Sequence, residues 1–116
     1  MELDYTSPNG YQSFDLDELD KLAEKAQPYH EFLRRRGCSL GIYVLPAGGT
    51  DQQHPHTSDE VYVVLRGNGA LRVRDQEVPV RQGSVISVDH SEDHKFVNIT
   101  EDLHVLVVFA PPDEPD

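Results

Sequence analysis

Three histidines and one carboxylate are the residues of this chain best suited to metal chemistry. His54 and His56 stand one residue apart, Glu60 follows after a short gap, and His94 lies further along the chain. Neutral imidazole nitrogens together with an ionised carboxylate oxygen suit divalent Fe, Mn, Cu, Ni and Zn. The four residues therefore predict a site for one divalent transition metal ion per chain and leave the element open.

The spacing of the first three ligands fits extended backbone. Residues i and i+2 of an extended segment point to the same side, so His54 and His56 can face one ion. The run Glu60 to Gly67 is apolar, β-branched and closed by glycine, as strands are. It predicts a strand on which Tyr62 shares a face with Glu60, one side chain further in.

The same parity places Phe96 and Asn98 on the face of His94. Two strands that each begin with a ligand and continue apolar describe a site inside a β-barrel. We expect Val64, Phe96 and Ile42 to line the pocket, which favours a small, partly hydrophobic substrate. Asn98 can hydrogen-bond near the site or fix the turn after its strand.

The segment from Gly48 to Gly67 resembles the first motif of the cupin family, G-x5-H-x-H-x3-E-x6-G, without a gap. In that family the two histidines, the glutamate and a later histidine are metal ligands, which implies this role for His54, His56, Glu60 and His94. The resemblance also implies an all-β fold, a double-stranded β-helix or jelly-roll barrel over residues 38–110 with one short N-terminal helix.

The second cupin motif, G-x5-P-x-G-x2-H-x3-N, is met by Gly83, His94 and Asn98. Its proline and second glycine are replaced by Asp89 and Ser91, residues that also form turns. The departure concerns the shape of the loop before His94 and the opening of the barrel, while the ligand itself is retained.

Composition and charge restrict the class of protein. A chain of 116 residues has the usual size of one domain. The formal charge of -11, from 21 acidic and 10 basic residues, argues against nucleic acid and anionic membranes as partners. Arg34 to Arg36 form the one basic run, which we interpret as a solvated bend before the next strand.

The single cysteine, Cys38, excludes an intramolecular disulfide and favours a reducing, cytoplasmic setting. We interpret Cys38 as a small core residue. The N-terminus lacks the features of a secretory signal, and no apolar run is long enough to span a membrane.

Residues 1–37 are expected to form an N-terminal segment with a helix at about residues 15–27, lying against the outside of the sheets. Asp15 is a suitable N-cap with Glu18 at N3, and Pro28 ends the helix. The tail, residues 111–116, is acidic and proline-rich and is expected to be disordered.

After the helix the chain alternates between strands and turns. Gly67 to Gly69 and Arg74 to Glu77 are expected to be tight hairpin turns, and Pro79 favours an edge strand. The expected strands are 39–45, 60–66, 70–74, 77–80, 84–88, 95–99 and 103–109.

The last expected strand is apolar on both faces apart from His104, so its outer side must be covered. The N-terminal helix and a second subunit are the two candidates, and we expect a homodimer. We interpret His104 as a satisfied buried histidine, His30 as exposed, and His90 as a solvent-facing turn residue.

Three classes of function are compatible with the site. The first is an oxygenase, as the likeness to small cupin dioxygenases implies, in which Glu60 shifts from ligand to base on a small oxygen-bearing substrate. The second is a non-redox isomerase, epimerase or lyase with Tyr62 or His104 as base. The third is a protein that binds a small ligand without turnover. We favour the oxygenase, with Glu60 and Tyr62 as catalytic residues.

Overall fold

The computed structural model describes residues 9–25, 28–51 and 57–112, and these contain one helix and six strands. His54 and His56 lie outside the described residues, as do most of the expected acidic tail and the start of the N-terminal segment. The elements are α1 (Leu16–Lys25), β1 (Tyr29–Arg34), β2 (Ser39–Leu45), β3 (Asp59–Val73), β4 (Gln76–Arg81), β5 (Val85–Val88) and β6 (His94–Ala110).

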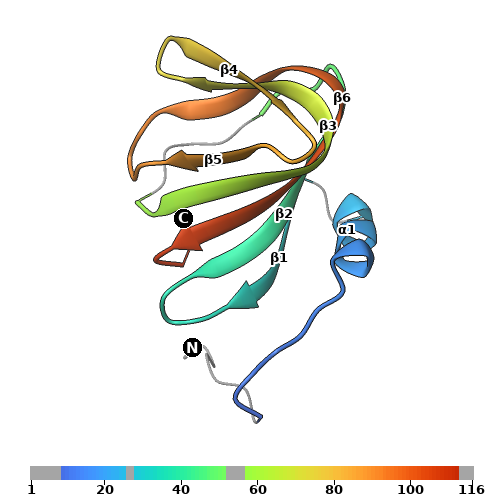
Figure 1. Ribbon diagram of the computed structural model, residues 1–116, viewed down its shortest axis with the longest axis vertical. Coiled ribbons are helices and arrows are strands. Elements are labelled where there is room, and N and C mark those ends of the chain that lie inside the picture. Colours follow the sequence, from blue (N-terminus) through green and yellow to red (C-terminus); the bar gives the residue numbers. More distant parts are fainter. Residues whose placement is uncertain (1–8, 26–27, 52–56, 113–116) are drawn as a thin grey trace.

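Two long antiparallel strands, β3 and β6, form the centre of the sheet, whose order is β1-β2-β6-β3-β4 with β5 also paired to β3. The first part of β3 pairs with β5 and with the end of β6, and its last part pairs with β4 and with the start of β6. Because both strands bend, the sheet curls into two facing walls around an interior (Figure 1). The expected all-β barrel with one short helix is confirmed.

The bend of β3 occurs at Gly67, where the sequence had predicted a hairpin. That prediction was wrong, because residues 59–73 form one strand whose register with β6 shifts near Gly67. Gly67 has φ +103, and a Cβ at this position would lie 2.2 Å from the Asp102 carbonyl oxygen. Only glycine allows β3 and β6 to cross this closely. The strands expected at 95–99 and 103–109 are likewise one strand, β6.

Strand β1 was not predicted. Its six residues mix polar and apolar side chains without strict alternation, and they pair with β2 at the edge of the sheet. The sheet therefore begins at Tyr29 rather than at Ser39. The turn at Arg74 and Asp75 joins β3 to β4 as expected, and Pro79 lies on β4 at the other edge of the sheet order.

The barrel interior is filled by apolar side chains that alternate along the strands. Val64 and Phe96 belong to this interior, as expected. The buried residues of this cluster are Tyr43, Leu45, Tyr62, Val64, Leu71, Val80, Val88, Phe96, Ile99, Leu103, Val105, Val107 and Phe109.

Helix α1 lies outside the barrel and covers part of its outer face (Figure 1). Asp15 caps it, since Oδ1 accepts the N–H of Glu18 at 3.2 Å. Leu19 and Ala23 of the helix pack with Ile42 and Val44 of β2, while Leu106 of β6 packs against this cluster. The placement of Ile42 in the pocket was therefore wrong, because alternation on β2 turns Tyr43 inward and Ile42 toward the helix.

The helix thus provides one of the two covers expected for β6, and the homodimer stays a prediction. In the described parts of the chain, no helix has the length and apolar character needed to cross a membrane.

Candidate functional site

Glu60 and His94 begin the two central strands, and the fold brings them together inside the barrel. Glu60 is the second residue of β3 and pairs with Phe109 of β6 and Val88 of β5. His94 is the first residue of β6. Their exposed fractions are 1% and 3%, so both functional groups are withdrawn from bulk water.

Tyr62 completes a compact polar cluster with these two residues. Its hydroxyl donates to Glu60 Oε1 at 2.8 Å. The hydroxyl oxygen of Tyr62 also lies 2.8 Å from His94 Nε2. His94 Nε2 also lies 3.0 Å from Glu60 Oε2. The Tyr62 ring packs edge-on against Phe96, with centroids 5.0 Å apart. The expected common face of Glu60, Tyr62 and Val64 is therefore observed.

The orientation of the His94 ring follows from its other nitrogen. Nδ1 lies 2.7 Å from the backbone carbonyl oxygen of Glu92. A carbonyl oxygen only accepts, so Nδ1 carries the proton and donates it. In the neutral ring, Nε2 then presents a lone pair to the interior, as a metal-binding histidine does when an outer acceptor fixes its tautomer.

One contact of this cluster lacks a hydrogen-bond donor when His94 is neutral. Tyr62 has a single hydroxyl proton, which Glu60 Oε1 accepts, so the short contact between His94 Nε2 and Glu60 Oε2 joins two acceptors. The contact becomes favourable when a second ring proton or a metal ion lies at Nε2. Protonation of His94 or a bound cation would therefore stabilise this pair.

The neighbours of His94 and Tyr62 shift the pKa values of both groups. Burial by itself lowers the pKa of His94, but the hydrogen bonds to Glu60 and to the Glu92 carbonyl, together with the Glu60 and Asp51 carboxylates, raise it above its usual value. Burial, followed by the negative charge of Glu60, raises the pKa of Tyr62. These effects favour the protonated form of Tyr62, which donates its hydrogen bond to Glu60.

The donor set fits a divalent metal ion. Two ligand atoms bound at 2.0–2.2 Å to one ion, at right angles, lie about 3 Å apart. The separation of His94 Nε2 and Glu60 Oε2 is 3.0 Å. Over residues 9–25, 28–51 and 57–112, no group of three His, Cys, Asp or Glu residues forms a complete metal site. Glu60 and His94 are the two predicted ligands within these ranges.

Buried polar residues stand on both sides of the segment that carries the other two predicted ligands. Asp51, which precedes it, is 7% exposed, and its Oδ2 accepts the N–H of Phe96 at 2.9 Å. Ser58, which follows it, is 1% exposed. Both of these residues are therefore withdrawn from bulk water.

The loop before His94 holds its shape without the proline and second glycine of the motif. Ser91 takes the glycine position with φ 61, in the left-handed region. Asp59 Oδ1 accepts the N–H of His90 at 2.8 Å. Arg74 pairs with the Glu92 carboxylate through two nitrogens, with Nη2 at 3.0 Å from Oε2. Side-chain contacts to β3 and the β3–β4 turn thus hold this loop.

Other sequence-predicted residues lie away from the interior. Asn98 has φ 50 and is exposed, with its amide donating to Glu77 Oε1 at 3.3 Å, so it shapes a bend of β6 rather than the site. His90 is solvent-facing, as expected. His30 is half-buried on β1, where it had been expected to be exposed. Cys38 is half-buried in the β1–β2 turn rather than in the core.

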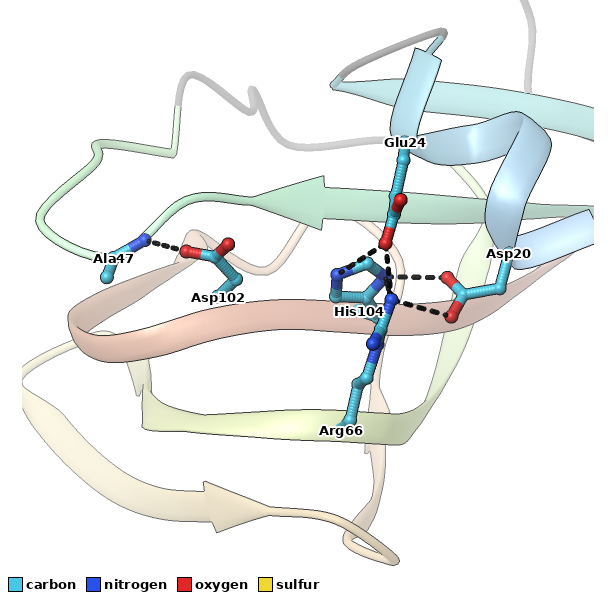
Figure 2. Close-up of polar contacts among 6 residues, drawn as sticks. All are labelled: Asp20, Glu24, Ala47, Arg66, Asp102 and His104. Carbon is cyan, nitrogen blue, oxygen red and sulfur yellow. Dashed lines mark hydrogen bonds and ion pairs between the residues drawn. The ribbon is translucent and has the colours of Figure 1, made fainter. Parts of the chain in front are cut away.

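His104 lies on the opposite face of β6, beneath α1 (Figure 2). Its Nδ1 is 2.6 Å from Asp20 Oδ1, and Arg66 pairs with Asp20 at 3.4 Å and with Glu24. The histidine is 4% exposed and its ring is satisfied by the helix. This confirms its interpretation as a satisfied buried histidine and removes it as a candidate base.

Sequence reasoning missed Asp51 and the Glu92 carbonyl. Asp51 stands in a glycine-rich loop whose local composition is that of an ordinary turn. Its position between the motif glycine and the first histidine was the one available signal. A backbone carbonyl has no sequence signal of its own.

The family model described as "Cupin domain" matches residues 41–109. An uncharacterized protein of Streptomyces coelicolor is 49% identical over 105 residues, covering 88% of this chain and 98% of that protein. An oxalate-binding protein of Thermotoga maritima is 33% identical over 66 residues. That match covers 55% of this chain, which spans 54% of that protein's length.

Solved structures show the same architecture. A protein of Thermus thermophilus is similar with a TM-score of 0.72 and 23% identity, covering 88% of this chain and 99% of that chain. A cupin family protein of Methanocaldococcus jannaschii with a double-stranded β-helix fold has a TM-score of 0.65 and 22% identity, covering 72% and 78% of the two chains. At these identities the likeness concerns the fold, and it confirms the double-stranded β-helix.

Proposed function

Since the chain belongs to the cupin family, we propose that it holds one divalent transition metal ion at His54, His56, Glu60 and His94 and acts as a dioxygenase-like oxygenase on a small organic substrate. The observation that carries the proposal is the convergence of His94 Nε2 and Glu60 Oε2 at 3.0 Å inside the barrel. Cupins generally bind a metal, which agrees with a cluster that calls for a cation.

The bound ion would supply Lewis acidity and, in the case of Fe, Mn or Cu, a redox couple for dioxygen. In a dioxygenase both oxygen atoms of O2 end in the product, so the reaction needs no separate reductant. The apolar neighbours of the cluster, Phe96 and Phe109 among them, favour a small and partly hydrophobic substrate.

The chain's own groups divide the remaining work. Glu60 is the proton acceptor for the substrate as well as a ligand, because its carboxylate lies inside the barrel beside Tyr62 and His94, where the substrate would bind. Tyr62 keeps its proton and orients the Glu60 carboxylate from inside the barrel. The Glu92 carbonyl keeps the His94 ring in the tautomer whose Nε2 faces the interior.

The test combines metal analysis with oxygen uptake. Protein loaded separately with Fe(II), Mn(II), Cu(II), Ni(II) or Zn(II) is measured by elemental analysis and with an oxygen electrode, using a panel of small organic acids and enolisable carbonyl compounds. We expect one ion per chain and substrate-dependent oxygen uptake with Fe, Mn or Cu. The His54→Ala/His94→Ala double variant should lose both.

Turnover that continues without oxygen would replace the oxygenase by a non-redox isomerase, epimerase or lyase. Absence of stoichiometric metal from the unsubstituted protein would rule out both enzyme classes.

A second candidate, ligand binding without turnover, is favoured by the likeness to the oxalate-binding protein. Oxalate is a small dianion, and a buried divalent ion would attract it. Isothermal titration of the metal-loaded protein with oxalate tests this candidate. Saturable binding with no oxygen uptake and no product would favour it over the oxygenase.

A further inference from the structure

Asp51 is a buried carboxylate next to the candidate metal site that the proposed function does not use. It is 7% exposed and is the last described residue before His54 and His56. Its Oδ2 accepts the backbone N–H of Phe96 at 2.9 Å. Phe96 lies two residues after His94 on β6, so this bond ties the chain that leads to two predicted ligands to the strand that carries another.

Through the Phe96 ring, the position of this strand also affects Tyr62 and Glu60. The Phe96 ring packs edge-on against Tyr62 at 5.0 Å, and Tyr62 holds Glu60 through its hydroxyl. A shift of Phe96 would therefore move both the start of β6 and the ring that supports Glu60. Asp51 also places a second buried carboxylate on the backbone of Phe96, two residues from His94.

A buried carboxylate is costly unless hydrogen bonds or a positive charge compensate it. The hydrogen bond from the Phe96 N–H offsets part of the cost of burying the Asp51 carboxylate. A cation at the site would offset a further part. Two buried carboxylates, Asp51 and Glu60, would then act on one divalent ion, the first through its charge and the second as a ligand.

We propose that Asp51 is a positioning residue of the metal site, which holds the start of β6 in place through Phe96 and adds a negative charge that strengthens cation binding. The proposal rests on the proposed metal site. Asp51 acts through its hydrogen bond to Phe96 and through its charge, without a contact to the ion.

The chain contains a matched control for this role. Asp102 is also an aspartate that accepts a backbone N–H from a distant part of the chain, from Ala47 to Oδ1 at 2.8 Å (Figure 2). Asp102 is exposed and lines a surface pocket together with Arg66 and His104. Replacing it removes the same kind of bond from the same β2–β3 connection without touching Tyr62 or His94.

The test measures Co²⁺ affinity by competition with a chelator in Asp51→Asn, Asp51→Ala, Asp102→Asn and Asp102→Ala. Loss of an outer partner of a metal site typically weakens binding by about 10- to 100-fold, which we expect for Asp51→Ala. Asp51→Asn keeps an acceptor for Phe96 but loses the charge, so we expect a smaller loss, about 3- to 10-fold. Both Asp102 variants should stay within about twofold of the unsubstituted protein.

Two further readouts separate positioning from simple destabilisation. The visible absorption of bound Co²⁺ should change in Asp51→Ala and stay unchanged in the Asp102 variants, even where their melting temperatures fall equally. If Asp51→Ala does not fold, Asp51→Asn decides alone. Affinities of the Asp51 variants equal to those of the matching Asp102 variants would overturn the proposal.

The unsubstituted protein and His94→Ala, measured in parallel, report on the site itself. If the former binds no Co²⁺, the proposed metal site and the role of Asp51 both fail. If it binds Co²⁺ and only the Asp51 effect is missing, the metal site stands and the role of Asp51 fails.

Discussion

Two histidines on the same strand have opposite surroundings. His94 and His104 both lie on β6, are 3% and 4% exposed, and contact carboxylates. His94 points into the barrel toward Glu60 and Tyr62. His104 points outward to Asp20 of the helix, beside Arg66. Burial and an acidic neighbour therefore do not by themselves distinguish a ligand from a structural histidine.

The difference lies in the charge that balances the acids. We call Glu60, Tyr62 and His94 the inner cluster, and Asp20, Glu24, Arg66 and His104 the outer cluster. In the outer cluster, Arg66 carries a permanent positive charge and pairs with both Asp20 and Glu24. Within the described residues, the side chains in polar contact with the Glu60 carboxylate are Tyr62 and His94, and neither has a permanent positive charge. The outer cluster is complete as a link between helix and barrel, whereas the inner cluster gains from an added cation.

The largest expected effect is a separation of metal binding between the two histidines. His94→Ala removes a predicted ligand and should weaken metal binding by more than the ~100-fold that loss of an outer partner can cost. His104→Ala should leave the affinity within about twofold, because it lies on the other face of the strand. Chelator competition measures both, and equal losses in the two variants would contradict the comparison.

Substitutions in the outer cluster should lower the stability of the protein. Asp20→Ala removes the partner of buried His104 Nδ1 and one partner of Arg66, which should lower the free energy of unfolding by about 1–3 kcal/mol. Urea unfolding of the metal-free protein measures the change. Asp17→Ala, an exposed acid on the same helix, is the control, and a comparable loss there would point to the helix alone.

Tyr62→Phe should have a smaller effect on stability, through the loss of one hydrogen bond in the inner cluster. The ring can still pack against Phe96, but Glu60 Oε1 loses its donor, which should cost about 1–2 kcal/mol of stability. We expect the metal content to be retained and the turnover to fall. Elemental analysis and oxygen uptake test this, and an unchanged turnover rate would remove Tyr62 from the catalytic residues.

The smallest expected effect concerns the loop that leads to the inner histidine. Ser91 has φ 61, a conformation that glycine adopts without strain, so Ser91→Gly should raise the free energy of unfolding by about 0.5–1 kcal/mol. Thermal or urea unfolding measures it. Ser87→Gly, on strand β5, should instead destabilise, and the same sign in both variants would show that backbone conformation is not the cause.

The sequence predicted the inner cluster well because strand alternation is a local property. Once Glu60 and His94 were placed at strand starts, period-two spacing was enough to put Tyr62 and Phe96 on the interior face. The N-cap at Asp15 was predictable for the same reason, since it depends on residues within one turn of helix.

What the sequence could not settle depends on contacts between distant segments. Gly67 has the same neighbours in sequence whether β3 turns or bends, and the approach of Asp102 decides between them. Ile42 and Tyr43 are both apolar, so the face that turns inward is fixed only by pairing with β6. The roles of Asp51 and of the Glu92 carbonyl likewise appear only when β6 is in place.

The pairing of β2 with β6 also has a kinetic consequence. Ser39 pairs with Phe109, so residues from opposite ends of the barrel sequence must meet before the wall closes. Forming such distant contacts requires closing a long loop of chain, and β proteins of this kind fold on a timescale of about milliseconds to seconds. Glu60 and His94 lie on different strands, so we expect their side chains to come together only when β3 and β6 have paired. We therefore expect cation binding at the proposed site to require the folded barrel.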